Sequence, residues 1–146
     1  MIPDFTVSGL LPPGIHKAEW PEIVARLGGN AHRRALLGGL QRALEALRRA
    51  GCETVYLDGS FVTSKGSPGD YDLCWSVAGV DVNRLDPVLL IFDNKRRAMN
   101  AKYMGDLFPA EVPEGRTGRT FLQFFQIDKI SGDAKGVLMI DLRELP

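Results

Sequence analysis

Apolar residues recur along much of this chain at the spacing of an amphipathic helix, and three helices follow from that period. Asn30 suits a helix N-cap, and leucines then recur on one face until Gly51 ends the pattern. Pro21 fits the first turn of a shorter helix, and Asp86 followed by Pro87 predicts the start of a third. The expected helices span approximately residues 21–27, 30–51 and 86–102.

Shorter apolar runs lie between these helices and are typical of buried strands. Four strands are expected, approximately at residues 54–57, 71–77, 103–108 and 136–142. A further apolar segment, residues 121–126, has mixed spacing that fits either a helical turn or a strand. Because helices alternate with strands, the pattern predicts an α/β (α+β) fold in which helices flank a small mixed β-sheet.

The length of the chain and its proline-containing start set the expected organisation. The chain has 146 residues, which suits one domain with one core. Residues 10–14 read LLPPG, a stiff extended lead-in that ends in a turn. We therefore expect a single domain over residues 1–146, with residues 1–29 as an N-terminal extension packed on it.

The most informative stretch, residues 55–75, joins a turn to a pair of acidic side chains. Gly59 and Ser60 follow one apolar strand-like run, and Asp70 and Asp72 lie at the start of the next. Strand side chains alternate between faces, so the two carboxylates project together and repel each other unless a cation lies between them. Hard oxygen ligands suit Mg²⁺, which commonly takes one or two protein carboxylates together with substrate phosphates.

The loop between the turn and the two aspartates carries groups suited to phosphate. Glycine lets a backbone approach a ligand closely, and serine offers a hydroxyl and a backbone N–H. Lys65 lies in the same loop and would add a positive charge. We therefore expect Gly59, Ser60 and Lys65 to bind phosphate.

The order of these residues resembles the signature of the polymerase-β-like nucleotidyltransferase superfamily. Leu57, then Gly59 and Ser60, precede a nine-residue spacer, which leads to Asp70 and Asp72 between apolar neighbours. The short chain is most similar to the minimal nucleotidyltransferases, many of which belong to bacterial toxin–antitoxin or defence loci. The resemblance covers about residues 57–73, and the surrounding elements agree in order with that fold.

The resemblance implies a Mg²⁺-dependent transfer of an NMP from an NTP, such as ATP, to a hydroxyl of a protein, an RNA or a small molecule. Gly59 and Ser60 would hold the triphosphate. Asp70 and Asp72 would bind two Mg²⁺ ions, with Mn²⁺ as an alternative.

The same family supplies a third carboxylate from a neighbouring strand. Asp106 is the expected residue, because it lies on the next strand after a helical crossover, and Asp141 is its rival. This group would help to hold the catalytic metal and would act as a base toward the acceptor hydroxyl.

The balance of charged residues limits which partners the chain is expected to bind. Lys plus Arg equals Asp plus Glu at 18 each, so no global field draws the protein to nucleic acid or an anionic membrane. The basic groups at residues 32–34 and 95–97 are expected on exposed helix faces, with RNA or phosphate binding as the alternative. Cys52 and Cys74 are expected to be reduced core thiols. No apolar run approaches the length of a membrane span and no signal-peptide pattern is present, which predicts a cytoplasmic protein.

Two other functions compete with nucleotidyl transfer. The loop over residues 61–69 differs from the common family form, and no acceptor-binding domain is evident. A non-catalytic module that keeps the fold, such as an antitoxin-like partner of another protein, would explain both features. A metal-dependent phosphohydrolase would use the same carboxylates, but no His-rich metal motif or evident nucleophile accompanies them.

Overall fold

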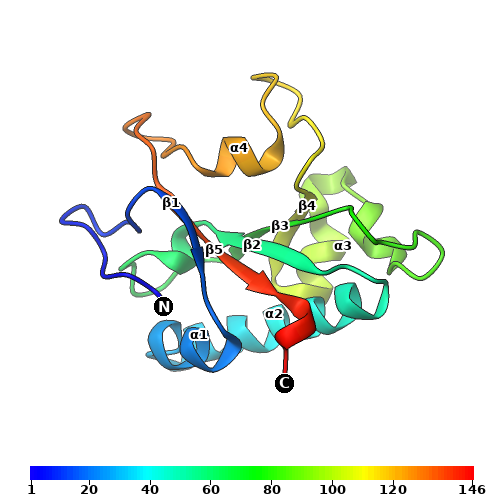
Figure 1. The fold of residues 1–146 in the computed structure, drawn as a ribbon, viewed down its shortest axis with the longest axis horizontal. Coiled ribbons are helices and arrows are strands. Elements are labelled where there is room, and N and C mark those ends of the chain that lie inside the picture. The colour runs from blue at the N-terminus through cyan, green and yellow to red at the C-terminus, as the bar shows by residue number, and fades with distance from the viewer.

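A five-stranded mixed sheet forms the middle of the structure, a computed structural model that describes residues 1–146 (Figure 1). The strands are β1 Gly14–Lys17, β2 Thr54–Asp58, β3 Tyr71–Trp75, β4 Gly105–Pro109 and β5 Gly136–Asp141. Their order across the sheet is β1-β5-β2-β3-β4. The central strand β2 runs antiparallel to both of its neighbours, whereas β1 pairs with β5, and β3 with β4, in parallel.

Helices cover the two faces of this sheet unequally. The α-helices are α1 Trp20–Leu27, α2 Ala31–Arg49, α3 Asp93–Tyr103 and α4 Phe121–Phe125, and the 3-10 turns are η1 Ser60–Val62, η2 Pro87–Leu90 and η3 Leu142–Glu144. Figure 1 shows α1 and α2 along one face of the sheet, while α4 stands over the other. Helix α3 packs beside the edge strand β4. The fold is therefore the mixed α+β arrangement that the alternating pattern predicts.

The main core lies between α2 and the sheet. The Asn30 side chain caps α2 by accepting a hydrogen bond of 2.8 Å from the third helical N–H. Leu40 and Leu44 of α2 are fully buried in one cluster with Leu57 and Leu73 of β2 and β3. Burying a leucine side chain contributes about 1.5–3 kcal/mol, so this helix face anchors the two strands that carry the candidate site.

Gly39 accounts for close packing between α2 and α3. A Cβ atom at this position would lie 2.3 Å from the carbonyl oxygen of Tyr103, which no real side chain tolerates. The adjacent Gly38 meets no such obstacle. The glycine pair therefore weakens the helix at two positions but serves close approach at only one.

Strand β1 is not predicted by the hydrophobic pattern. Its four residues are mostly exposed, and it pairs with β5 from Gly14 opposite Gly136 to Lys17 opposite Met139. Backbone pairing holds this edge strand in place, so its side chains carry no alternation of buried and exposed positions. The N-terminal segment therefore extends the sheet.

The single helix expected over residues 86–102 is wrong. Asp86 caps only the short turn η2, and the backbone is extended at Ile91 before α3 begins. This break places Phe92 against Phe108, with the two rings stacked and their centroids 6.0 Å apart. The Asp-Pro signal marks a helix start, but it carries no information about a tertiary contact that interrupts the helix.

Two strands differ from the expected ranges at one end. Strand β3 ends at Trp75: the Ser76 N–H still donates to the Thr54 carbonyl oxygen at 2.9 Å, but the Val77 N–H donates to the Glu111 carboxylate at 2.9 Å instead of to a strand. Strand β4 starts later than expected, because Met104 ends α3 with a left-handed φ of 63°. Both shifts arise from contacts of side chains or caps that apolar spacing does not report.

The remaining expectations on local structure hold. The segment at residues 121–126 forms the helical turn of α4. Cys52 and Cys74 are buried free thiols, as expected. None of the helices is long and apolar enough to cross a lipid bilayer.

Candidate metal centre and cleft

Three neighbouring strands bring acidic residues to one end of the sheet. The Cα atoms of Asp58 and Asp72 are partners in the antiparallel pair of β2 and β3. Those of Asp72 and Asp106 are partners in the parallel pair of β3 and β4. Asp70 directly precedes β3, two residues before Asp72, and its carboxylate lies near that of Asp72. The sheet register therefore sets the spacing of Asp58, Asp72 and Asp106.

Asp70, Asp72 and Asp106 form what we call the acidic cluster. One carboxylate oxygen from each lies within 4.8 Å of the other two, and all three side chains are half-buried. Asp141 lies at the opposite end of the sheet, where Arg143 donates to its carboxylate at 2.9 Å. The structure thus brings Asp106, and not Asp141, to the predicted pair.

No positive side chain neutralises the predicted pair, because no lysine or arginine forms an ion pair with Asp70 or Asp72. Burial, and then the charge of Asp70, raises the pKa of Asp72 from 3.8 to about 7. Burial, and then the charge of Asp106, raises the pKa of Asp70 as well. The cluster therefore carries poorly compensated negative charge, which is the condition that favours a divalent cation.

The turn at Gly59 packs directly on this cluster. Gly59 has a φ of 85°, in the region that favours glycine, and a Cβ there would lie 2.7 Å from Oδ2 of Asp72. Conformation and space therefore both require glycine at this position. Backbone thus approaches the carboxylates closely, with Ser60 starting the turn η1 beside them.

Arg33 holds the loop that follows this turn, and its expected place on an exposed helix face is wrong. The side chain is 7% exposed and its guanidinium donates to the carbonyl oxygens of Leu27, Phe61, Thr63 and Lys65. The guanidinium also lies 5.2 Å from the centroid of the Phe61 ring. A run of basic residues in the sequence does not reveal which member turns inward to satisfy backbone carbonyls.

Lys65 does not lie where a phosphate-binding lysine is expected. Its residue is exposed, and it is absent from the lining of the cleft that contains Gly59, Ser60, Asp72 and Asp106. Arg33 fixes its backbone by binding the carbonyl oxygen, and its N–H donates to Thr63 Oγ1 at 3.2 Å. The structure therefore separates Lys65 from the other two predicted phosphate ligands.

Asp106 is held by two donors from α3. Arg96 Nε and Asn100 Nδ2 donate to its Oδ1 at 2.9 and 2.6 Å. Residues 94–96 have φ values of 51°, 55° and 61°, so the segment that presents Arg96 is strained left-handed backbone. Both bonds engage Oδ1, and neither engages the second oxygen of Asp106.

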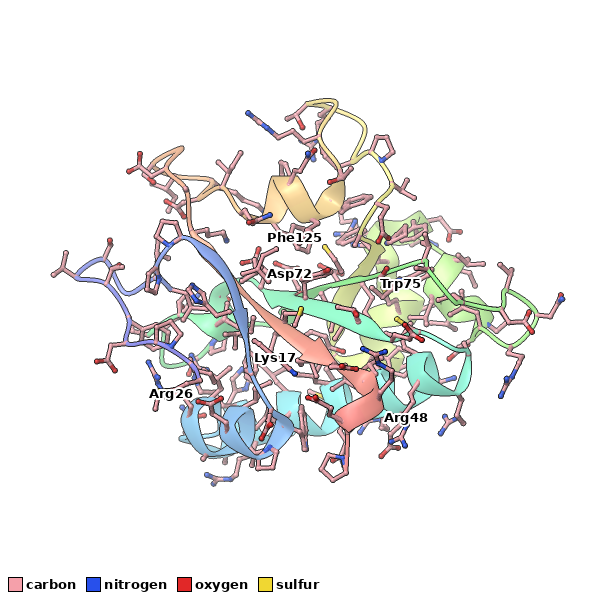
Figure 2. The ribbon with its side chains drawn as sticks, in the orientation of Figure 1. Lys17, Arg26, Arg48, Asp72, Trp75 and Phe125 are labelled. Carbon is pink, nitrogen blue, oxygen red and sulfur yellow. The ribbon has the colours of Figure 1, made fainter.

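A cleft of about 930 Å³ opens over Asp72 and Asp106 of the acidic cluster, between the sheet and the segment that joins β4 to β5, and Asp70 does not line it. We call this segment, residues 110–135, the arm. Figure 2 shows Asp72 and Phe125 in the space between the sheet and α4, which belongs to the arm. The wall opposite the carboxylates is apolar: Phe108 stacks on Phe121 with centroids 4.5 Å apart, and Phe124 lines the same wall. The cleft thus joins an acidic floor to an aromatic wall.

Sequence reasoning missed several residues of this cleft. The apolar spacing favours a core position for Phe121 and Phe124 over a base-stacking surface, yet both are half-buried and line the opening. Lys135 also lines it, beside the buried Asp58. A lysine directly before the last apolar strand is the only signal in the sequence, and it becomes informative only once β5 is known to pair with β2.

The chain belongs to DUF6932, described as a family of unknown function, whose model matches residues 3–141. No curated protein and no solved structure matches the chain. The family description therefore names no chemistry.

Proposed function

We propose that this member of the DUF6932 family is a Mg²⁺-dependent nucleotidyltransferase of the polymerase-β-like type, which moves an NMP from an NTP to an acceptor hydroxyl. The observation that carries the proposal is the acidic cluster beside the Gly59 turn. Its carboxylate oxygens lie within 4.8 Å of one another, and backbone approaches Asp72 at a position that only glycine fits. This is the arrangement that a metal-bound triphosphate needs.

The residues present fit a divalent cation. Three carboxylates offer hard oxygen ligands, and burial, followed by the charge of Asp70, raises the pKa of Asp72, both of which a bound cation would offset. Asp70 and Asp72 would hold one or two ions, with Asp106 as the third carboxylate. Bound Mg²⁺ would neutralise phosphate oxygens and stabilise the charge that develops during transfer.

The reaction is a displacement at the α-phosphorus. The acceptor hydroxyl oxygen forms a bond to the α-phosphorus, the bond to the bridging oxygen breaks, and pyrophosphate leaves with that oxygen. The hydroxyl proton passes to a carboxylate of the acidic cluster. Asp106 suits this role because Arg96 and Asn100 fix its Oδ1 and neither of them binds its second oxygen, which faces the cluster in this proposal.

The aromatic wall serves the same reaction by limiting water. The arm places three phenylalanines on the cleft, Phe121, Phe124 and Phe125. A substrate bound there would therefore expose little of its surface to solvent. The acceptor is a protein, an RNA or a small molecule, and a toxin–antitoxin or defence role is part of the same hypothesis.

A non-catalytic nucleotide-binding module is the second candidate. The observation that favours it is the Arg96 contact, because a permanent cation on Asp106 competes with a metal for the third carboxylate. Such a module would bind an NTP with Mg²⁺ but would release no pyrophosphate in the presence of any acceptor.

Incubation with α-labelled NTPs, Mg²⁺ and panels of protein, RNA and small-molecule acceptors tests the proposal. Label transfer and pyrophosphate release should occur with the wild type and be lost in Asp70→Asn and Asp72→Asn. Asp141→Asn is the matched control, because it removes a carboxylate from the same sheet at the far end. Transfer that survives both cluster substitutions would exclude this site, and release of orthophosphate instead would indicate a phosphohydrolase.

A further inference from the structure

Lys135 lies beside the Gly59 turn although the two are far apart in the sequence. Strand β5 starts at Gly136 and runs antiparallel to β2, with Leu138 opposite Leu57. Continuing that register places Lys135 level with Ser60, where the arm joins β5 (Figure 1). Its side chain is only 13% exposed, which is unusual for a lysine, and it lines the cleft.

Asp58 is the partner of this lysine. Its carboxylate is 4% exposed, and its Oδ1 lies 3.1 Å from Lys135 Nζ. The contact is an ion pair without the angles of a hydrogen bond, since Oδ1 has no hydrogen-bond partner. The ammonium donates no hydrogen bond to any other protein atom, so its N–H groups remain available at the cleft.

The other cations of the cleft are differently placed. Arg96 is engaged by Asp106, whereas Arg116 and Lys129 are exposed on the arm. A buried ammonium is desolvated already, so it loses less hydration when it meets an anion than an exposed one does. Lys135 is therefore the cation of this cleft best prepared to meet an anionic group beside the turn.

We propose that Lys135, positioned by the buried carboxylate of Asp58, forms a polyphosphate-binding subsite with the Gly59-Ser60 turn. This inference rests on the proposed function for its ligand, the β- and γ-phosphates of an NTP. Lys135 takes the role that the sequence assigns to Lys65. Asp58 does not contact the phosphate; it is a positioning residue that holds the ammonium at the turn.

Titration calorimetry with inorganic tripolyphosphate in Mg²⁺ buffer tests this subsite without any transfer reaction. Lys135→Met should weaken binding by roughly tenfold or more, as expected for loss of a charge-assisted contact, and Lys135→Arg should restore part of it. Asp58→Asn should weaken binding less. Lys129→Met, which removes an exposed cation from the same cleft, should change the affinity by less than about threefold.

The double variant Asp58→Asn/Lys135→Met replaces both charges of the buried pair with neutral groups. It tests whether Asp58 acts by positioning Lys135 or only by stabilising the fold. If Asp58 acts through Lys135, the double variant should bind tripolyphosphate as weakly as Lys135→Met alone. Thermal unfolding of each variant reports whether it is folded. Unchanged tripolyphosphate affinity in the folded double variant, or no binding by the wild type, would overturn the proposal. Binding that depends on Lys135 in a protein that transfers no NMP would support the subsite and count against the proposed reaction.

Discussion

Oδ2 of Asp72 lies 2.7 Å from the position that a Cβ atom of Gly59 would occupy. The Gly59 turn after β2 therefore packs directly against the Asp72 carboxylate of the adjacent strand β3. Gly59, which the sequence predicts as a phosphate-binding residue, is also the residue that packs on the acidic cluster. Under the proposed function, phosphate and metal would bind at this one place.

Gly59→Ala should therefore destabilise the protein and disturb the cluster. A φ of 85° with a ψ of −173° is a backbone conformation that essentially only glycine adopts, so it costs an alanine about 1–3 kcal/mol, and the contact with Asp72 adds to this. Urea unfolding should show a loss of at least that size. Gly66→Ala is the matched control, because Gly66 has no positive φ and no atom within 4 Å of its Cβ position. Equal stability of the two variants would contradict the requirement for glycine at position 59.

The stability of the metal-free protein should depend on pH through Asp72. Its pKa is about 7 in the folded protein against an ordinary value of 3.8, so the folded state binds this proton more tightly. The free energy of unfolding should fall as pH rises from about 4 to about 7 and then level, because the charged form is disfavoured in the fold.

Thermal unfolding in EDTA at a series of pH values measures this effect against Asp72→Asn. The variant should lack this contribution and should gain stability relative to the wild type as the pH rises to 8. A constant difference in stability between the two proteins across that range would show that the fold does not raise the pKa of Asp72.

Arg33→Met should weaken the fold near the turn. It removes donors from four carbonyl oxygens and leaves those in the interior unpaired, each at a cost of about 1–3 kcal/mol. We expect a loss of about 2–4 kcal/mol in urea unfolding. Arg34→Met, on the exposed side of the same helix, should change stability by less than about 0.5 kcal/mol. Equal effects of the two substitutions would refute the role of Arg33.

Arg96→Gln should strengthen Mg²⁺ binding. The guanidinium lies beside Asp106 and competes with a cation for its charge. Removing a partly exposed ion pair worth about 1 kcal/mol should lower the Kd for Mg²⁺ about fivefold by calorimetry. Arg97→Gln is the control, because Arg97 is exposed and forms no ion pair. Weaker Mg²⁺ binding by Arg96→Gln would instead mean that Arg96 builds the site by orienting Asp106.

The sequence predicts the parts of the site that depend on local spacing. Asp70 and Asp72 share a face because strands alternate, and Gly59 lies beside them because an antiparallel strand follows the loop. The resemblance calls for a third carboxylate, and the helical crossover to the next strand favours Asp106 over Asp141. The parallel register of β3 and β4, which the sequence does not contain, sets Asp106 opposite Asp72.

Other parts of the site depend on contacts between distant segments. Lys135 reaches the turn only through the pairing of β5 with β2, and Arg33 turns inward only because the loop carbonyls need donors. Lys65 lies in the loop next to the site, as the sequence predicts, but it is exposed and does not line the cleft. Proximity in sequence therefore predicted the carboxylates better than it predicted the cations.

Anomalous diffraction from crystals grown with Mn²⁺ and an unreactive NTP analogue tests the central claim most directly. We predict a manganese peak bound by carboxylate oxygens of Asp70 and Asp72, with the triphosphate against the Gly59-Ser60 turn. A nucleotide bound elsewhere, or a cluster that stays free of metal while Arg96 retains Asp106, would contradict the account.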